Sequence, residues 1–248
     1  MASSDADTRM SGLERILVFA LGDRTAEFGE TESRIQSCVL PSPLARFYRF
    51  AGRWPVPHPR RSPILFETPA EGYFYAGVQH AHLMTLEDLK SAEHGRIAVF
   101  WEQAGNWTGA TETEGNDPLV WVQGTTGLGS FSEPVESGET LSGWLVSHCL
   151  GALAWETANS YCCATLERRP IVSGHTSGLL TWFESDTRQT TKLWKGRQTI
   201  CHELSGTFFS FNGEILVHEC GNLVRMAAFT RGAAEQMHER ATSADNLE

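Results

Sequence analysis

Acidic and tryptophan residues alternate over residues 99–124, VFWEQAGNWTGATETEGNDPLVWVQG. This pattern fits two kinds of site. In many glycoside hydrolases a pair of carboxylates cleaves the glycosidic bond, and indole rings can hold the sugar beside them. On a protein-binding surface, carboxylates attract a basic partner and a tryptophan provides an anchor. Glu112 and Glu114 fall in a turn rich in Gly, Thr and Asn, where acids are usually solvated, so the pattern favours a solvated acidic hairpin tip over a catalytic pair.

Two groups of histidine and cysteine residues have metal-ligating side chains. His80 and His82 would point to the same face of a strand, but no Asp, Glu or Cys completes a recognisable ligand set. A second group lies on two predicted strands and contains Cys201, His202, His218 and Cys220. Adjacent strand residues face opposite sides, and the short C-x2-4-C spacing of structural zinc sites is absent. We therefore expect no metal.

The usual catalytic motifs are also absent from the sequence. Cys162 and Cys163 are followed by His175, but no local signature of a cysteine hydrolase surrounds them. The segment VSGHTSG is not a G-x-S-x-G elbow, and no G-x-x-x-x-G-K-[ST] phosphate loop occurs. The glycines of GTTGLGS are predicted to form a flexible loop. We expect neither a catalytic residue nor a cofactor, so the protein is predicted not to be an enzyme.

The charge of the chain restricts the class of partner. Its 248 residues carry a formal net charge of -10, and 41% of them are hydrophobic, which is enough for a substantial core. Binding to nucleic acid or to an anionic membrane requires clustered Lys and Arg, so neither partner is expected. Two explanations of the acidity stay open: attraction of a basic protein partner, or simple solubility.

The sequence also bears on the location of the protein. No stretch approaches the roughly 20 apolar residues that a membrane span needs. Asp5 and Asp7 precede the first apolar run, whereas a secretory signal has a basic start. We therefore expect a cytoplasmic protein in which the six cysteines are reduced.

Helical periodicity predicts four main helices. The first ten residues are expected to be frayed, and a helix over 13–21 would be capped by Ser11 and Glu14. A proline-initiated helix is predicted over 42–51, a long apolar helix capped by Ser137 over 139–158, and a last helix over 230–241. A short helical turn is predicted over 85–90.

Strand patterns fill two regions between these helices. Runs of β-branched and aromatic residues predict strands at 96–101, 106–111, 119–122, 179–184, 191–195, 206–211, 214–219 and 222–229. Asn212-Gly213 suits a hairpin turn. The pattern predicts an α+β (mixed α/β) fold with a central, mostly antiparallel sheet covered by helices. We expect one domain over residues 11–241, with a flexible tail over 242–248.

The order of these features resembles a known superfamily. The helix LPSPLARFYRFAG has Phe47, Tyr48 and Gly52 at positions similar to those of that family. The strand and turn RIAVFWEQAGNW is followed by NDPLVWV and the long helix, and the C-terminal segment 208–237 looks like the family's closing hairpin and helix. Over residues 11–240 the chain resembles the SUKH superfamily (Smi/Knr and Syd-like), although residues 166–205 match no part of it.

The resemblance implies a non-enzymatic protein-binding domain, most often a bacterial immunity protein that neutralises a cognate toxin, frequently a basic nuclease. The expected partner-binding residues are Glu102, Gln103, Trp107, Glu112, Glu114 and Asp117. For Trp107 the alternative is a position in the core of the sheet. Two other functions stay open: a hydrolase or glycan-active enzyme using the acids near the tryptophans, and a regulatory scaffold. Neither the toxin nor the oligomeric state follows from the sequence.

Overall fold

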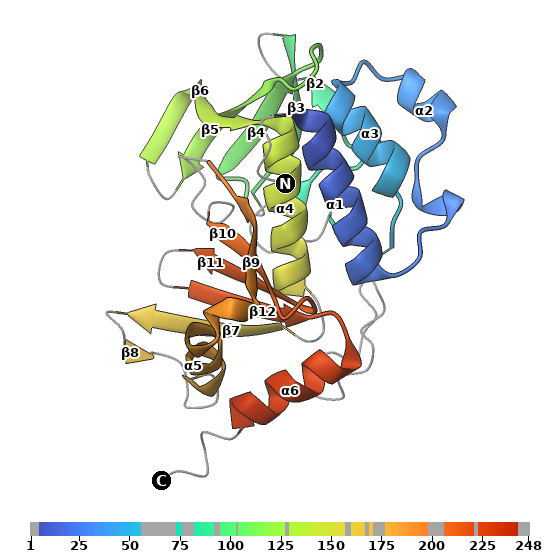
Figure 1. The fold of residues 1–248 in the computed structure, drawn as a ribbon. Coiled ribbons are helices and arrows are strands. Elements are labelled where there is room, and N and C mark those ends of the chain that lie inside the picture. The colour runs from blue at the N-terminus through green and yellow to red at the C-terminus, as the bar shows by residue number, and fades with distance from the viewer. Residues whose placement is uncertain are drawn as a thin grey trace.

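The computed structural model describes residues 5–55, 73–75, 82–91, 95–102, 104–126, 129–156, 160–166, 169–170, 177–197, 206–220 and 223–242. These residues form two antiparallel sheets, one above the other in the view of Figure 1, with helix α4 (Leu141–Glu156) running beside both. The predicted α+β fold with antiparallel strands is confirmed, and its strands are divided between two sheets.

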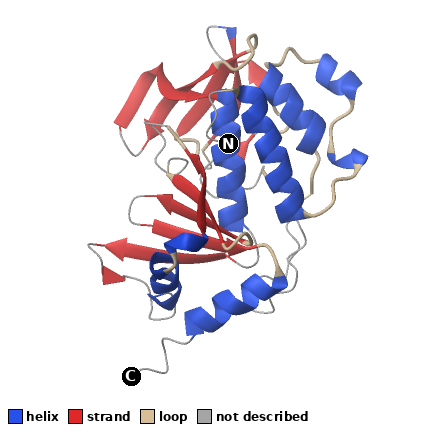
Figure 2. Ribbon diagram, in the orientation of Figure 1, coloured by secondary structure: helices blue, strands red, loops and turns tan. Residues whose placement is uncertain are grey.

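The N-terminal helices lie on one side of the first sheet (Figure 2). They are α1 (Ala6–Leu21), the 3-10 turn η1 (Ala26–Phe28), α2 (Glu32–Gln36) and α3 (Ser42–Ala51). Helix α1 begins earlier than predicted because the Asp5 carboxylate accepts a hydrogen bond from Thr8 N and caps it. Ser11 is therefore an interior residue of the helix and not its cap, and residues 6–10 are helical instead of frayed.

The first sheet has strand order β1-β3-β4-β5-β6, with β2 also paired to β3. Its strands are β1 (His82–Leu83), β2 (Lys90–Ser91), β3 (Arg96–Trp101), β4 (Trp107–Glu112), β5 (Leu119–Thr126) and β6 (Gly129–Thr140). The predicted strands β3, β4 and β5 are confirmed. Strand β6 was not predicted, and the turn over 85–90 is not a helix.

Helix α4 is buried between the other elements because it is apolar on all sides. Trp144 and Leu145 are fully buried, and the indole Nε1 of Trp144 donates to Ser137 Oγ at 2.9 Å. Ser137 therefore holds the indole and does not cap the helix as predicted. Within the described residues, neither α4 nor any other helix has the length and apolar character of a membrane span.

The second sheet has strand order β8-β7-β12-β11-β10-β9. Its strands are β7 (Ser160–Leu166), β8 (Arg169–Pro170), β9 (Thr190–Lys195), β10 (Thr207–Phe211), β11 (Ile215–Cys220) and β12 (Leu223–Ala228). Residues 179–184 belong to helix α5 (Ser177–Ser185), so the strand predicted there is wrong. The 3-10 turn η4 (Thr187–Gln189) follows α5, and α6 (Arg231–Thr242) ends the described chain and confirms the last predicted helix.

The two sheets share one main hydrophobic core. Phe208 and Leu216 from the second sheet pack in the same buried cluster as α4 and the first sheet. Because strand side chains alternate, Phe211 and Val217 point to the other face, where they form a smaller cluster with α5 and α6. The shared core explains why the chain folds as a single α+β domain.

Candidate functional site

Glu102 organises the turn between β3 and β4. Its carboxylate accepts hydrogen bonds from Ala104 N at 2.9 Å, Asn106 N at 3.1 Å and Asn106 Nδ2 at 3.0 Å. Gly105 occupies the left-handed region with φ +74°, which the tight turn requires. Glu102 is therefore a structural residue of the turn that a partner could reach only in part. The neighbouring Gln103 lies outside the described residues.

Trp107 is a core residue. It is 3% exposed, and its ring packs edge-on against Trp144 of α4 with 6.1 Å between the centroids. The alternation of β4 explains this position, because Trp107, Gly109 and Thr111 all face α4. The interpretation of Trp107 as sheet core is confirmed, and the ring is not available as an anchor for a partner.

Asp117 joins three elements at the start of α4. Its carboxylate accepts hydrogen bonds from Ser142 N at 2.8 Å and Ser142 Oγ at 2.9 Å, so it caps the helix from a distant position in the chain. The same carboxylate pairs with the guanidinium of Arg9 from α1, and both side chains are largely buried. Asp117 is therefore occupied within the fold and not presented to a partner.

Of the predicted site residues that the structure describes, Glu112 and Glu114 are the two with exposed side chains. Both are exposed, Glu112 at the end of β4 and Glu114 in the following turn. The hydrolase hypothesis needs two carboxylates on either side of a substrate in a pocket. Because Glu102 and Asp117 are engaged in the fold and the other two acids are exposed on the turn, the geometry does not support that hypothesis.

The face of the first sheet opposite α4 carries two further tryptophans, which are not among the site residues predicted from sequence. Val120 and Val122 are fully buried, so Trp121 between them points to the opposite face. Trp101 pairs with His82 on that same face and is 41% exposed. We call this surface the outer face and define it by His82, Arg96, Trp101, Glu112, Trp121 and Glu136. Strand alternation was the signal that could have identified it.

Cation–π and ring contacts order the outer face. The guanidinium carbon of Arg96 lies 3.9 Å from the ring centroid of Trp121. The His82 and Trp101 rings pack with centroids 5.1 Å apart. Among the described residues the indole Nε1 of Trp121 has no hydrogen-bond partner. These contacts hold two large rings in fixed positions, which lowers the entropic cost of using them for binding.

Negative charge is concentrated in the strands that form this face. Residues 96–140 contain seven carboxylates and one guanidinium, a formal charge of -6 out of -10 for the whole chain. The only basic residue among them is Arg96. Exposed members of this set include Glu112, Glu114, Glu133 and Glu136. The field of the first sheet therefore favours a positively charged partner.

The residues considered as metal ligands do not form a site within the described part of the chain. His218 is buried and stacks on Phe208 with 4.1 Å between ring centroids. His80, Cys201 and His202 lie outside the described residues. In the ranges that the structure describes, no group of three His, Cys, Asp or Glu side chains is arranged to hold a metal ion.

The side chains of Cys162, Cys163 and His175 also lie outside the part of the chain whose side chains are described.

Comparison of the chain with protein-family models, curated proteins and solved structures finds no match.

Proposed function

We propose that this chain is a non-enzymatic protein-binding domain that acts as an immunity protein and neutralises a basic protein toxin by direct contact. The observation that carries the proposal is the formal charge of -6 over residues 96–140, beside the exposed ring of Trp101. The resemblance to the SUKH superfamily points to the same function. The contact surface is the outer face with the β4–β5 turn. It keeps Glu112 and Glu114 of the six residues selected from sequence and leaves out Glu102, Gln103, Trp107 and Asp117.

Electrostatic attraction explains why such a surface suits a toxin inhibitor. An inhibitor has to reach the toxin before the toxin reaches its target, so the association rate matters as much as the affinity. Complementary charge raises association rates toward about 10⁸–10⁹ M⁻¹s⁻¹ at low salt, compared with about 10⁵–10⁶ for neutral surfaces. The exposed glutamates Glu112, Glu114 and Glu136 serve this role.

Trp101 is the anchor of the proposed interface. Its large ring is 41% exposed and is supported from the side by His82. Partly exposed aromatic rings with few accessible rotamers bury a large area on binding at low entropic cost, and tryptophan is enriched among interface residues that dominate affinity. Arg96 and Trp121 extend the same surface, and their stacked arrangement adds polar and aromatic contact groups.

The first experiment is a binding assay with the full chain as bait. The candidates are the protein products of genes adjacent to its own gene, tested at micromolar concentration and low salt. The expected result is a stoichiometric complex in which the partner loses its toxic activity without being chemically modified. Binding to none of these products, or a complex that retains full toxicity, contradicts the immunity function. The second result would favour a regulatory scaffold.

The second experiment assigns the surface. In the triple variant Glu112→Gln, Glu114→Gln, Glu136→Gln we expect association to slow by about tenfold at low salt and to depend less on salt. The matched control replaces three exposed glutamates that lie outside the first sheet, in the variant Glu27→Gln, Glu184→Gln, Glu235→Gln. If association slows equally in both triple variants, the net charge of the whole chain sets the association rate, and the assignment to the outer face is contradicted.

Trp101→Ala tests the anchor separately. We expect the complex to dissociate faster and to lose about 2 kcal/mol or more of binding free energy, with little change in association rate. Phe19→Ala is the control because Phe19 is 52% exposed on α1. An unchanged dissociation rate in Trp101→Ala would remove this residue from the interface.

A further inference from the structure

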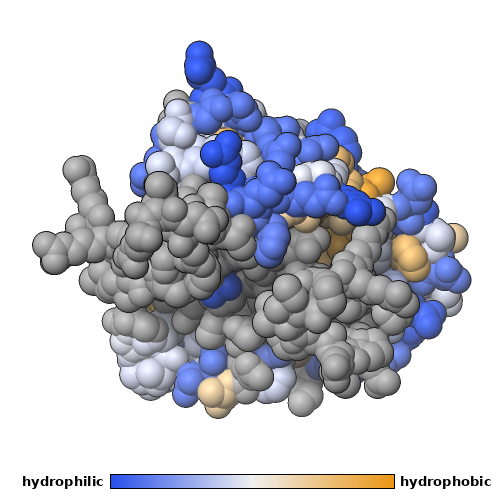
Figure 3. All heavy atoms as spheres, turned by 90° about the horizontal axis from the view of Figure 1, so that it is seen from below, coloured by the Kyte–Doolittle hydropathy of each residue, from blue (hydrophilic) through white to orange (hydrophobic). Residues whose placement is uncertain are grey.

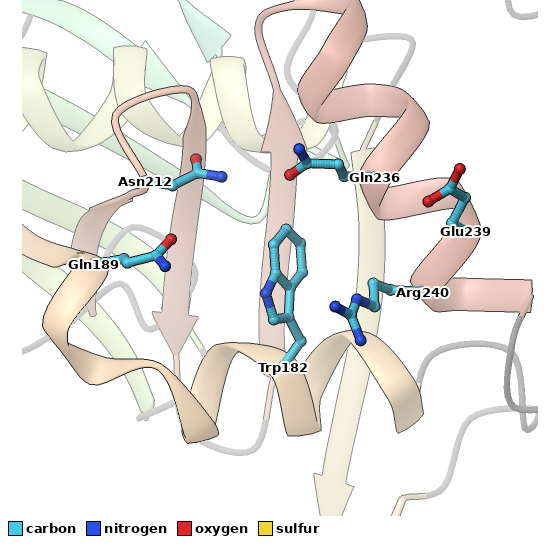
Figure 4. A pocket seen from close by; sticks show the side chains of 6 residues that line it. All are labelled: Trp182, Gln189, Asn212, Gln236, Glu239 and Arg240. Carbon is cyan, nitrogen blue, oxygen red and sulfur yellow. The ribbon is translucent and has the colours of Figure 1, made fainter.

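A pocket of about 420 Å³ lies at the end of the molecule that carries α6, far in sequence from the outer face. Six side chains line it: Trp182, Gln189, Asn212, Gln236, Glu239 and Arg240 (Figure 4). Helix α5 provides the indole, η4 and the β10–β11 hairpin provide two amides, and α6 provides the rest. The volume falls within the range of about 300–1,000 Å³ that is common for small-molecule sites.

The indole of Trp182 forms an aromatic platform in this pocket. The ring is partly exposed, and the edge-to-face contact with Phe211 at 4.7 Å between centroids holds it in place. Phe211 is fully buried, as is most of the neighbouring Phe183, so the platform is anchored to the smaller hydrophobic cluster. The Arg240 guanidinium lies 5.7 Å from the indole centroid.

Three carboxamides surround the platform. Asn212 and Gln189 come from adjacent turns that are tied together, because Asn212 N donates to the carbonyl of Gln189 at 2.9 Å. The Gln189 side chain is held through Nε2, which donates to Asp186 at 2.5 Å, so its Oε1 still has acceptor capacity. Gln236 extends from α6 toward the indole (Figure 4). The rim thus presents both donors and acceptors.

The helical period explains the remaining polar groups. Gln236, Glu239 and Arg240 recur at three- and four-residue spacing and line one side of α6, beside the buried stripe of Ala233 and Met237. Glu239 and Arg240 have opposite charge, so the charges on the rim cancel. Seen from the α6 end, most of the described surface is hydrophilic (Figure 3).

We propose that this pocket binds a neutral saccharide of one or two rings. Sugar rings have an apolar C–H face that stacks on an indole and a periphery of hydroxyl groups that both donate and accept. Carboxamides match this periphery because each contributes a carbonyl acceptor and two N–H donors. An anionic ligand is disfavoured by the balanced rim and by the net charge of -10. A nucleobase also stacks on an indole, so adenosine is the competing ligand to be tested beside the sugars.

The experiment uses saturation-transfer NMR on the full chain with millimolar D-glucose, D-galactose, D-mannose, N-acetyl-D-glucosamine, and their common disaccharides. We expect transfer to the ring protons of at least one of these sugars. In Trp182→Ala the affinity for that sugar should fall by about tenfold or more, because the stacking surface is removed. Phe19→Ala is the matched control, since it removes a partly exposed aromatic ring from α1, far from the pocket in sequence.

Gln236→Ala tests the rim without touching the packed indole, because Gln236 is exposed. We expect a loss of about threefold or more in affinity and an unchanged unfolding curve. Gln123→Ala on the first sheet is its control. The proposal is overturned if no sugar of the panel binds, if binding is unchanged in both pocket variants, or if adenosine binds while the sugars do not. These outcomes do not depend on the proposed toxin partner.

Discussion

At the scale of single residues, the same chemical group has different roles depending on its partners. Asp117 follows a Gly- and Asn-containing turn, which is why the sequence predicts an exposed acid of the binding surface. In the structure it caps α4 and neutralises Arg9, which lies 108 residues away in the chain. No local pattern around Asp117 contains this information, because it depends on the position of α1.

The Asp117 cluster leads to a stability prediction. Asp117→Ala leaves the buried Arg9 without its counter-charge and α4 without its cap, so we expect a loss of about 3–5 kcal/mol in the free energy of unfolding by urea. Adding Arg9→Met should restore all but about 1 kcal/mol, because only the cap is then missing. Glu112→Ala is the exposed control, expected within about 0.5 kcal/mol. If Asp117→Ala is as stable as Glu112→Ala, the structural role of Asp117 is contradicted.

His148 on α4 makes stability depend on pH. Burial lowers the pKa of His148 from 6.5 to about 4, with the charge of His82 as a further cause, while its Nε2 donates to the Tyr75 carbonyl at 2.7 Å. The unfolded chain takes up this proton near pH 6.5, whereas the folded chain does not until about pH 4. Stability contributed by neutral His148 is therefore complete above pH 6.5 and falls as the pH drops toward 4.

We expect His148 alone to lower the free energy of unfolding by about 2–3 kcal/mol when the pH falls from about 7 to about 4.5. His148→Gln retains a donor for the Tyr75 carbonyl and does not titrate, so its unfolding free energy should fall less over the same range. Urea unfolding of both proteins at a series of pH values measures the difference. Parallel pH curves for the two would show that His148 is not responsible.

At the scale of secondary-structure elements, periodic apolar patterns predicted α4, α6 and most strands, because each of these elements buries one face or all of its surface. Residues 179–184 were misassigned since a short apolar run fits a strand or a buried helix equally well. Strand β6 was missed because its Gly, Ser and Glu residues have low strand propensity. Its pairing with β5 compensates, and only the tertiary structure reveals that contact.

Two glycines test the local geometry of these elements. Gly124 in β5 has φ +113°, and a Cβ there would lie 2.2 Å from the carbonyl oxygen of Asn106. We expect Gly124→Ala to cost roughly 2–4 kcal/mol through strain and overpacking. Gly151 in α4 has open space where an alanine methyl group would lie, so Gly151→Ala should stabilise by up to about 1 kcal/mol. Thermal unfolding distinguishes them, and a shift in the same direction for both would contradict this geometry.

At the scale of the whole molecule, the α+β class followed from the order of predicted elements, but the division into two sheets did not. Antiparallel strands of similar composition can extend one sheet or start another, and the separation depends on which side chains pack against α4. Trp194 illustrates this dependence, because its Nε1 donates to Ser147 of α4 at 2.8 Å. The candidate outer face was likewise missed because it requires the strand register, whereas its acidity is plain from the sequence.

The core shared by the two sheets predicts that they unfold together. Leu145 on α4 is fully buried in that core, so Leu145→Ala should cost about 2–5 kcal/mol. If α4 couples the sheets, hydrogen exchange should show the same loss of protection in peptides from β4–β5 and from β10–β11. Val39→Ala is the control because Val39 is 70% exposed. This change should alter neither the free energy of unfolding nor the hydrogen-exchange protection of either sheet. Loss of protection confined to one sheet would mean that the sheets unfold independently, as two cooperative units joined only by the ends of α4.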